Sequence, residues 1–198
     1  IPYEILGIYN ALDVYWTHIL YEYLKPQIEA DENAVKAYDL ELAAADFLLR
    51  VEQRGIPFDL EAASDLEIEC ESIIMATTTA LRAITNDGGF NPNSPQQIKK
   101  WLYVRGIEVS GTSVDIIEEL ERTTVFEHVS KFCKSLLAYR KAAKISSTYV
   151  KGWKNKERDG RVHPTFLVHG TTTGRLSSTS PNAQNMPRNK AVRAIVGI

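Results

Sequence analysis

Apolar side chains recur at helical spacing through most of the first 85 residues. Residues 8–24, 35–51 and 60–84 each hold an apolar side chain every three or four positions, which predicts three amphipathic helices. Pro26 lies between the first two stretches, and Gly55-Ile56-Pro57 follows the second. Because proline and glycine disfavour a helix interior, we expect helices to end at these points.

A turn and a short helix are expected next. The run Asn86-Asp87-Gly88-Gly89 is typical of a turn. Ser94-Pro95-Gln96-Gln97 has the form of a capping box, in which the serine hydroxyl accepts from the N3 amide, proline takes the first helical position and Gln97 reaches back. This helix should end near Arg105, where Gly106 is a natural stop.

One long helix is predicted between Val129 and Val150. Its apolar positions keep a spacing of three, four and seven residues: Val129, Phe132, Leu136, Tyr139, Ala143 and Val150. The polar positions that fall on the opposite side, within about 100° on a helical wheel, are Lys134, Lys141, Lys144, Thr148 and Lys151. We therefore expect one face to pack and the other to be free to meet phosphate.

The pattern changes near residue 160. The stretch from Lys151 to Gly160 is polar and predicts a loop, and residues 161–168 alternate well enough to predict a strand. The apolar residues 192–198 indicate a further strand. The chain is therefore expected to be mainly α, with a few β-strands after residue 160.

Charge is distributed unevenly along the chain, although its net value is only −2. Residues 1–90 carry 5 basic and 17 acidic side chains, residues 91–130 carry 4 and 6, and residues 131–198 carry 14 and 2. An asymmetry of this size indicates that the C-terminal part binds a polyanion such as nucleic acid. A basic face that is merely solvated is the alternative.

Composition favours a soluble, intracellular protein without a membrane partner. No apolar run reaches the roughly 18 residues needed to span a bilayer, and the N-terminus lacks the pattern of a signal peptide. Cys70 and Cys133 lie far apart without CxxC or Cys/His spacing, so reduced, structural thiols are expected. The chain starts without Met and stops in an apolar stretch, so we expect both ends to be cut from something longer.

Residues 173–187, TGRLSSTSPNAQNMP, carry the most specific motif in the chain. They closely resemble the TGRLSS-x-x-PN-x-QN-x-P signature with which family A DNA polymerases, of the DNA polymerase I type, enter the palm. Three upstream blocks are similar to the thumb of that family and come in the same order: residues 54–59 (RGIPFD), 90–98 (FNPNSPQQI) and 139–149 (YRKAAKISSTY). The resemblance covers nearly the whole chain.

This resemblance implies three parts of a polymerase. Residues 1–30 would be the C-terminal helix of a 3′→5′ exonuclease domain, residues 31–160 a helical thumb with a long DNA-facing helix, and residues 161–198 the start of the palm. The parent would be α+β, whereas this portion would be mainly α with a few strands of an incomplete palm. The expected location is the cytoplasm of a bacterial cell or of a phage-infected host.

The family has DNA contacts in the motif and on the thumb helix. Arg175 would reach purine N3 and pyrimidine O2 at the primer terminus, which are minor-groove acceptors that every base pair shares. Asn182, Gln184 and Asn185 would donate to similar acceptors, unless their side chains only satisfy backbone groups of a turn. The matched contacts to the duplex backbone are Lys141, Lys144, Ser147 and Thr148 on the thumb helix. Arg188 and Arg193 lie where the family places basic residues near the primer and the incoming strand.

Tyr9 and Asp13 fit the Tyr-x-x-x-Asp pattern that closes a 3′→5′ exonuclease of the DEDD type. Residues four apart share a helix face, so Asp13 would ligate a divalent metal while Tyr9 orients the attacking water. A two-metal site needs several carboxylates, and the earlier acidic motifs are not in this chain. His163 has no Cys, Asp or Glu neighbour at metal-ligand spacing, so a strand histidine is favoured there.

In the family, the palm aspartates that hold Mg²⁺ and the basic helix that binds the dNTP follow the position of residue 198. We therefore expect a DNA-directed DNA polymerase, a nucleotidyltransferase of replication or repair, as the parent. The present chain would grip primer-template DNA without catalysis and without a bound metal. No thioredoxin-type processivity insertion is implied, because only the four residues from Asn86 to Gly89 occupy its place.

Other functions are consistent with the same residues. The chain could be a stand-alone non-catalytic DNA-binding or assembly module. It could be one half of a naturally split polymerase, with a second chain supplying the rest of the palm and the fingers. A metal-dependent exonuclease, of which only the last helix is present, is the third alternative.

Overall fold

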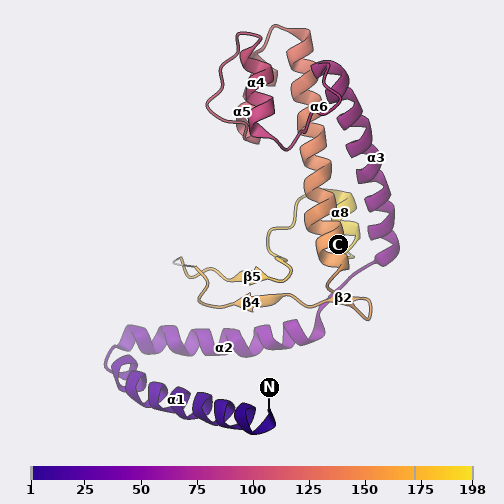
Figure 1. The fold of residues 1–198 in the computed structure, drawn as a ribbon. Helices are drawn as coiled ribbons and strands as arrows, with labels where there is room; N and C mark the ends of the chain where they lie inside the picture. Colours follow the sequence, from indigo (N-terminus) through magenta and orange to yellow (C-terminus); the bar gives the residue numbers. More distant parts are fainter. Residues whose placement is uncertain (1, 172, 198) are drawn as a thin grey trace. The chain divides into compact units, whose positions relative to one another are not determined.

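The computed structural model describes residues 2–171 and 173–197. The chain divides into two compact units: Ile1–Arg54 with Phe166–Ser177 form the first unit, and Gly55–Thr165 with Ser178–Ile198 form the second. Helices predominate and the strands are short (Figure 1), which confirms the expectation of a mainly α fold with few β-strands. Among the described helices, none combines the length and apolar character that a bilayer-spanning segment needs.

Two long helices, α1 (Tyr3–Glu29) and α2 (Glu32–Arg54), make up most of the first unit. The prediction that Pro26 separates them is wrong. Proline removes only its own N–H donor, and the Pro26 carbonyl still accepts from the Ala30 amide at 3.1 Å, so α1 continues to Glu29. The break falls at Asp31, whose carboxylate caps α2 by accepting from the Asn33 amide at 2.8 Å.

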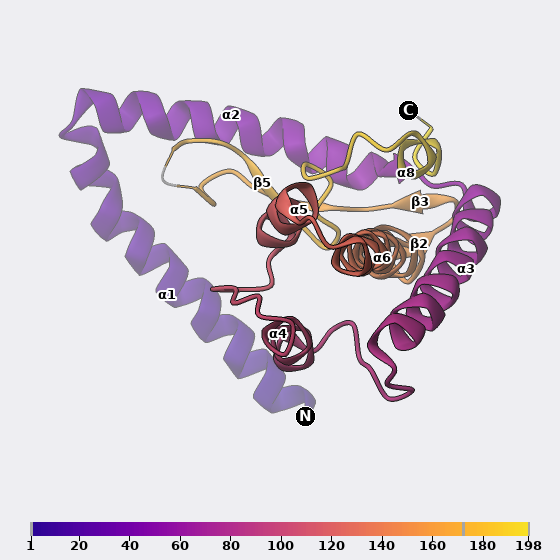
Figure 2. The same ribbon diagram turned by 90° about the horizontal axis from the view of Figure 1, so that it is seen from above.

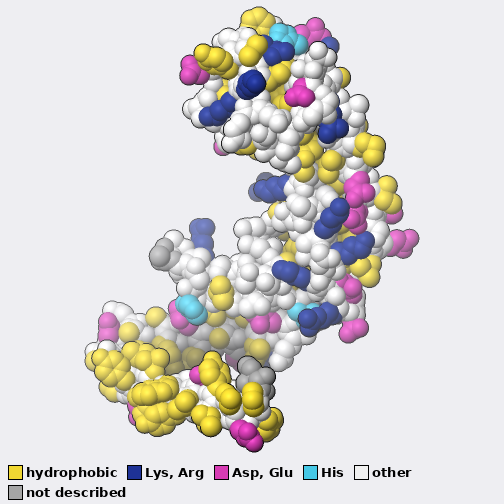
Figure 3. All heavy atoms as spheres, viewed as in Figure 1, with side chains coloured by type: hydrophobic (Ala, Val, Ile, Leu, Met, Phe, Trp, Pro, Cys, Tyr) yellow, Lys and Arg dark blue, Asp and Glu magenta, His cyan; other side chains and the backbone are white. Residues whose placement is uncertain are grey.

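The side chains of α1 lie open to solvent along its whole length, and none of them is buried. Large apolar residues on several sides of the helix, including Tyr3, Ile8, Val14 and Tyr23, are between 63% and 89% exposed. Figure 3 shows hydrophobic side chains crowded over this helix. A helix that is apolar all round is normally the core of a larger unit, and the described residues of the first unit do not provide that cover.

The strands form two small sheets. In one, β3 (Arg161–Val162) lies between β1 (Ile56–Pro57) and β2 (Glu157–Arg158), and Val162 is opposite both Ile56 and Glu157 in the antiparallel ladders. In the other, β4 (Thr165–Leu167) pairs with β5 (Ser177–Thr179). The single strand predicted for residues 161–168 is wrong, because Pro164 cannot donate to a ladder and divides it into β3 and β4.

Two long helices, α3 (Leu60–Thr85) and α6 (Glu127–Lys144), run side by side in the second unit (Figures 1 and 2). The Asp59 carboxylate starts α3 by accepting from the Glu61 and Ala62 amides at 3.0 and 2.9 Å. The helix ends at Asn86, which adopts the left-handed conformation with φ of 53°. Helices α4 (Pro95–Tyr103) and α5 (Val114–Thr123) share a hydrophobic cluster with α3 and α6.

The predicted capping box before α4 is half formed. The Ser94 hydroxyl accepts from the Gln97 amide at 3.3 Å, and Pro95 begins the helix, as expected. The Gln97 side chain does not return to Ser94. Its Oε1 accepts instead from the Asn91 amide at 2.7 Å, so it orders the loop that enters the helix.

Two expectations for the C-terminal part of the chain are wrong. The polar stretch from Lys151 to Gly160 is not a loop, because α6 continues into a π-helix, η1 (Ile145–Lys151), and then into α7 (Gly152–Lys154), before β2. The apolar stretch after Val192 is not a strand. It belongs to α8 (Lys190–Ala194) and to the turn that follows this helix. Asn189 caps the start of α8 by accepting from the Ala191 amide at 2.8 Å. Residue 198 lies outside the described residues.

Two hydrophobic clusters form the core of the second unit. The first joins α3, η1, α7 and α8 through buried residues that include Leu66, Cys70, Tyr149, Val150, Trp153, Val162 and Ile195. The second joins α3, α4, α5 and α6 through Leu81, Phe90, Ile98, Trp101, Ile117, Phe132, Cys133 and Leu136. Both cysteines are free, and burial raises the pKa of the Cys133 thiol to about 11, so they pack as protonated, apolar groups.

Phe132→Ala should lower the free energy of unfolding by about 3–5 kcal/mol, because it removes a fully buried ring that stacks on Trp101 at 4.1 Å between centroids. Urea unfolding followed by circular dichroism measures the change. Tyr103→Ala is the matched control, since this ring is 70% exposed and its loss should cost about 0.5 kcal/mol or less. Equal losses for the two variants would show that this cluster is not a core.

Candidate nucleic-acid interface

Four of the expected contact residues lie on the exposed side of the continuous helix formed by α6 and η1. Lys141, Lys144, Ser147 and Thr148 are all exposed, and neither lysine takes part in an ion pair with another described residue. The other side of this helix is fixed by burial of Phe132, Leu136, Tyr139, Ala142, Ser146, Tyr149 and Val150. Packing therefore presents two ammonium and two hydroxyl groups to solvent; we refer to these four residues as the helix row.

The lysines at both ends of the predicted polar stripe already have acidic partners, and Lys151 has also left the stripe. Lys134 lies 3.4 Å from the Glu121 carboxylate of α5. Lys151 lies 3.0 Å from Glu71 and 3.5 Å from Glu67, both on α3. Only the middle of the stripe, the helix row, remains without an acidic partner among the described residues.

The π-helix explains why Lys151 leaves the stripe. A π-turn closes on the fifth residue along the chain instead of the fourth, and the Gly152 amide indeed donates to the Ser147 carbonyl. Residues after such a turn fall behind α-helical positions by roughly the 100° that one residue spans. Lys151 is thereby turned away from Lys144 and towards α3.

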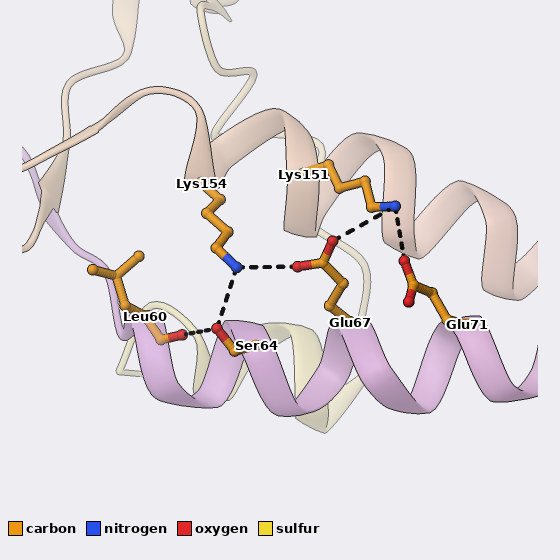
Figure 4. Close-up of polar contacts among 6 residues, drawn as sticks. All are labelled: Leu60, Ser64, Glu67, Glu71, Lys151 and Lys154. Carbon is orange, nitrogen blue, oxygen red and sulfur yellow. Dashed lines mark hydrogen bonds and ion pairs between the residues drawn. The ribbon is translucent and has the colours of Figure 1, made fainter.

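Lys151 belongs to a polar cluster between α3 and the end of the helix, drawn in Figure 4. Glu67 uses both carboxylate oxygens, one 3.5 Å from the Lys151 ammonium and the other 3.1 Å from that of Lys154, which also donates to the Ser64 hydroxyl at 3.2 Å. The hydrogen bond from Lys154 lowers the pKa of Glu67, and the hydrogen bond to Glu71 raises the pKa of Lys151. We call Ser64, Glu67, Glu71, Lys151 and Lys154 the Glu67 cluster.

The second candidate surface in this unit is the turn from Ser178 to Asn185. Its only buried polar side chain in the described structure is Ser178, whose hydroxyl accepts from the Ala183 and Gln184 amides at 3.1 and 3.2 Å. The Asn182 side-chain oxygen accepts from the Gln184 and Asn185 amides, both at 3.2 Å. Asn182 therefore satisfies the backbone of a turn, as the sequence allowed.

The same turn leaves donors available. Asn182, Gln184 and Asn185 are exposed, and the structure pairs none of their side-chain amide nitrogens with another described residue. For Asn182 the two roles are compatible, because its oxygen holds the turn while its NH₂ group can still donate to a partner.

A hydrogen bond links the turn to the helix that carries the helix row. The Tyr149 hydroxyl donates to the Asn185 carbonyl at 2.8 Å, and the ring of Tyr149 is buried in the first hydrophobic cluster. Tyr149 follows the helix row directly in sequence. The turn is therefore held against η1, the segment that also carries Ser147 and Thr148 on its exposed side.

The remaining expected contacts are arginines. Arg188 is exposed and Arg193 is half-buried on α8, which packs against α3 and η1 in the second unit. Arg175 belongs to the first unit, in the segment between β4 and β5. It is exposed, its carbonyl accepts from the Thr171 hydroxyl at 2.7 Å, and the preceding Gly174 has a φ of +69° that favours glycine.

Tyr9 and Asp13 lie one turn apart on α1, and both are exposed. The described residues contain no group of three or more His, Cys, Asp or Glu side chains placed to hold a metal ion. A lone carboxylate does not fit a Mg²⁺ site of the two-metal type.

The family model of "DNA polymerase family A" matches residues 61–196, which include the whole helix row and the Ser178–Asn185 turn. This chain belongs to DNA polymerase family A.

Several family A relatives align with the chain. It is 29% identical over 207 residues to the DNA polymerase of Escherichia phage T5, an alignment that covers 97% of this chain and 24% of that protein. It is 33% identical over 161 residues to DNA polymerase I of Streptococcus pneumoniae, covering 76% of this chain and 18% of that protein. The chain thus spans less than a quarter of the length of these curated relatives.

A solved structure of a family A enzyme agrees in fold. The polymerase domain of Pol1 from M. smegmatis, in complex with DNA primer-template and dNTP, matches with a TM-score of 0.64 and 33% sequence identity. The match covers 75% of this chain and 27% of that one.

Sequence reasoning missed two residues that organise this family A surface. Ser178 and Tyr149 both lie inside the motifs that carried the resemblance. Ser178 accepts from amides within its own turn, whereas Tyr149 donates to a carbonyl far away in sequence, and a sequence motif reveals neither hydrogen bond. Ser178 does not give the short-range signal of a serine turn, because the amides from which it accepts lie five and six residues further along the chain. Tyr149 gave no such signal, because its partner is 36 residues away.

Tyr149→Phe should lower the free energy of unfolding by about 0.5–1.5 kcal/mol, because the Asn185 carbonyl loses its donor while the buried ring is kept. Chemical denaturation measures the effect. Tyr103→Phe, at a position 70% exposed, is the matched control and should change nothing. If Tyr149→Phe is as neutral as the control, the link between the turn and the helix does not contribute to stability.

Proposed function

We propose that this chain is the part of a template-directed DNA polymerase that holds the primer-template. The observation that carries the proposal is the helix row, on a helix that Tyr149 ties from its packed side to a turn with unpaired amide donors. The M. smegmatis Pol1 neighbour, which is a complex with DNA primer-template and dNTP, supports the choice of ligand.

The helix row suits the phosphate backbone. Lys141 and Lys144 are exposed point charges without an acidic partner among the described residues, and Ser147 and Thr148 add neutral donors one turn further along. Lysine and hydroxyl groups bind phosphate without reading bases, as a polymerase that must hold any sequence requires. Arg188 and Arg193 extend the positive charge towards the primer and the incoming strand in this proposal.

The turn suits the minor groove. Asn182, Gln184 and Asn185 have side-chain NH₂ groups that can donate to purine N3 and pyrimidine O2, the acceptors that all base pairs share. Arg175, exposed between β4 and β5, is assigned the same kind of contact at the primer terminus. Contacts of this kind test base-pair geometry and not base identity.

Residues 1–30 are assigned to the end of a 3′→5′ exonuclease domain. The exposed apolar side chains of α1 support this, because such a helix belongs inside a larger unit. In the whole protein Tyr9 and Asp13 would then face the exonuclease site. We assign neither Mg²⁺ nor a dNTP to this chain, and expect it to neither extend nor digest a primer by itself.

The 198-residue chain should bind duplex DNA without sequence preference, and the logarithm of its affinity should fall linearly with the logarithm of salt. Lys141→Met and Lys144→Met should each reduce the magnitude of that slope by about 0.9, because each removes one neutralised phosphate. Fluorescence anisotropy with a labelled duplex, titrated between low and high salt, measures the slope.

Lys131→Met is the matched control, since Lys131 is on the same helix but lies 2.7 Å from Glu127. Its slope should equal that of the unmodified chain. Binding that does not respond to salt, or equal slope losses for all three lysines, would contradict the assignment of the helix row to DNA.

A further inference from the structure

The helix type changes within the helix row. Lys144 is the last residue of α6, and the π-helix η1 begins at Ile145. The π-turn at its end depends on Gly152, because a Cβ at this position would lie 3.0 Å from the Ser147 carbonyl, closer than ordinary van der Waals contact. A side chain at residue 152 would therefore press on the π-turn that Ser147 and Gly152 close.

The lysines beyond this change already have partners. Lys151 lies within 3.5 Å of both Glu67 and Glu71, and Lys154 lies 3.1 Å from Glu67. The Glu67 side chain is only 21% exposed, so removing both lysines from it would leave a half-buried carboxylate without a counter-charge. A phosphate could bind Lys151 only if the ion pairs of Lys151 with Glu67 and Glu71 were broken.

We infer that Lys151 and Lys154 are positioning residues that anchor the DNA-facing helix to α3, and that the DNA footprint of this helix ends at Thr148. The inference rests on the proposed function and deepens it. Without the π-turn, Lys151 would lie on the same face as Lys144 and would extend the row by a turn. Because of the π-turn, Lys151 pairs with Glu67 and Glu71 of α3 instead, and these ion pairs fix the direction in which the helix row points.

Exchanging the charges of Lys151 and Glu71 tests whether Lys151 anchors the helix or contacts phosphate. Lys151→Glu puts a carboxylate beside Glu67 and Glu71, so the melting temperature and the DNA affinity should both fall. Adding Glu71→Lys restores an opposite pair across the same two positions, and the new lysine is also four residues from Glu67 on α3. The double variant should therefore recover the melting temperature, the affinity and the salt slope of the unmodified chain.

Lys144→Met and Lys151→Met form the matched comparison in duplex-DNA titrations against salt. The first should reduce the magnitude of the slope by about 0.9, and the second should leave it unchanged. If Lys151→Met reduces the salt slope as much as Lys144→Met does, Lys151 contacts phosphate and the inference is wrong. The same follows if the Lys151→Glu/Glu71→Lys variant regains the melting temperature but not the salt slope of the unmodified chain.

The failure of the proposed function has a different signature. In that case the unmodified chain shows no salt-dependent binding at all. The melting temperatures still decide the anchoring role, because that role requires Lys151→Glu to destabilise the fold and Glu71→Lys to rescue it. A swap that fails to rescue the melting temperature overturns the anchoring role whatever the DNA titrations show.

Discussion

The helix formed by α6 and η1 packs against α3 along one side, and this burial limits which of its residues can meet a partner. Phe132 and Leu136 are fully buried in one cluster, and Tyr149 and Val150 are buried in the other. Each such side chain contributes about 1.5–3 kcal/mol that would be lost if the helix rotated. The direction of the helix row is therefore a consequence of core packing. The Tyr149 hydroxyl, which donates to the Asn185 carbonyl, also fixes the Ser178–Asn185 turn to this helix.

Part of the positive charge in the second unit is already neutralised by glutamates of the same chain. Residues 131–198 carry 14 basic and 2 acidic side chains, yet Lys151 and Lys154 are paired with glutamates of α3, and Lys134 with Glu121. These glutamates come from the acidic part of the chain before residue 131. The positive charge offered to a polyanion is thus smaller than the sequence suggests.

Sequence patterns predicted the features that depend on local physics. The long helix containing the row, the Ser94 cap and the mainly α fold follow from periodicity and from short-range hydrogen bonds, and the structure confirms them. The choice of helix-row and turn residues came from the family motif. Their roles in DNA binding remain a proposal, although their exposure and their neighbours are now known.

Features that depend on distant partners were not predictable. The π-turn leaves the apolar spacing of the helix almost unchanged, so only the position of Glu67 and Glu71 shows where Lys151 points. Residues 192–198 were expected to form a strand because they are apolar. Instead, α8 meets α3 and η1, and in the turn that follows it the Ile195 carbonyl accepts from the Asp59 amide at 2.7 Å, a partner more than a hundred residues away. Helix α5 is short, and its buried Ile117 gains its packing only in the assembled cluster.

The central claim is that one helix face and one turn, held together by Tyr149, form the DNA-binding surface of this chain. Nuclear magnetic resonance of the ¹⁵N-labelled chain during titration with a short primer-template duplex tests it most directly. The account predicts that amide signals of Lys141, Lys144, Ser147 and Thr148 shift together with those of Gln184 and Asn185, at one common affinity, while the signal of Lys131 stays in place. Shifts confined to other parts of the second unit, or different affinities for the helix row and the turn, would contradict it.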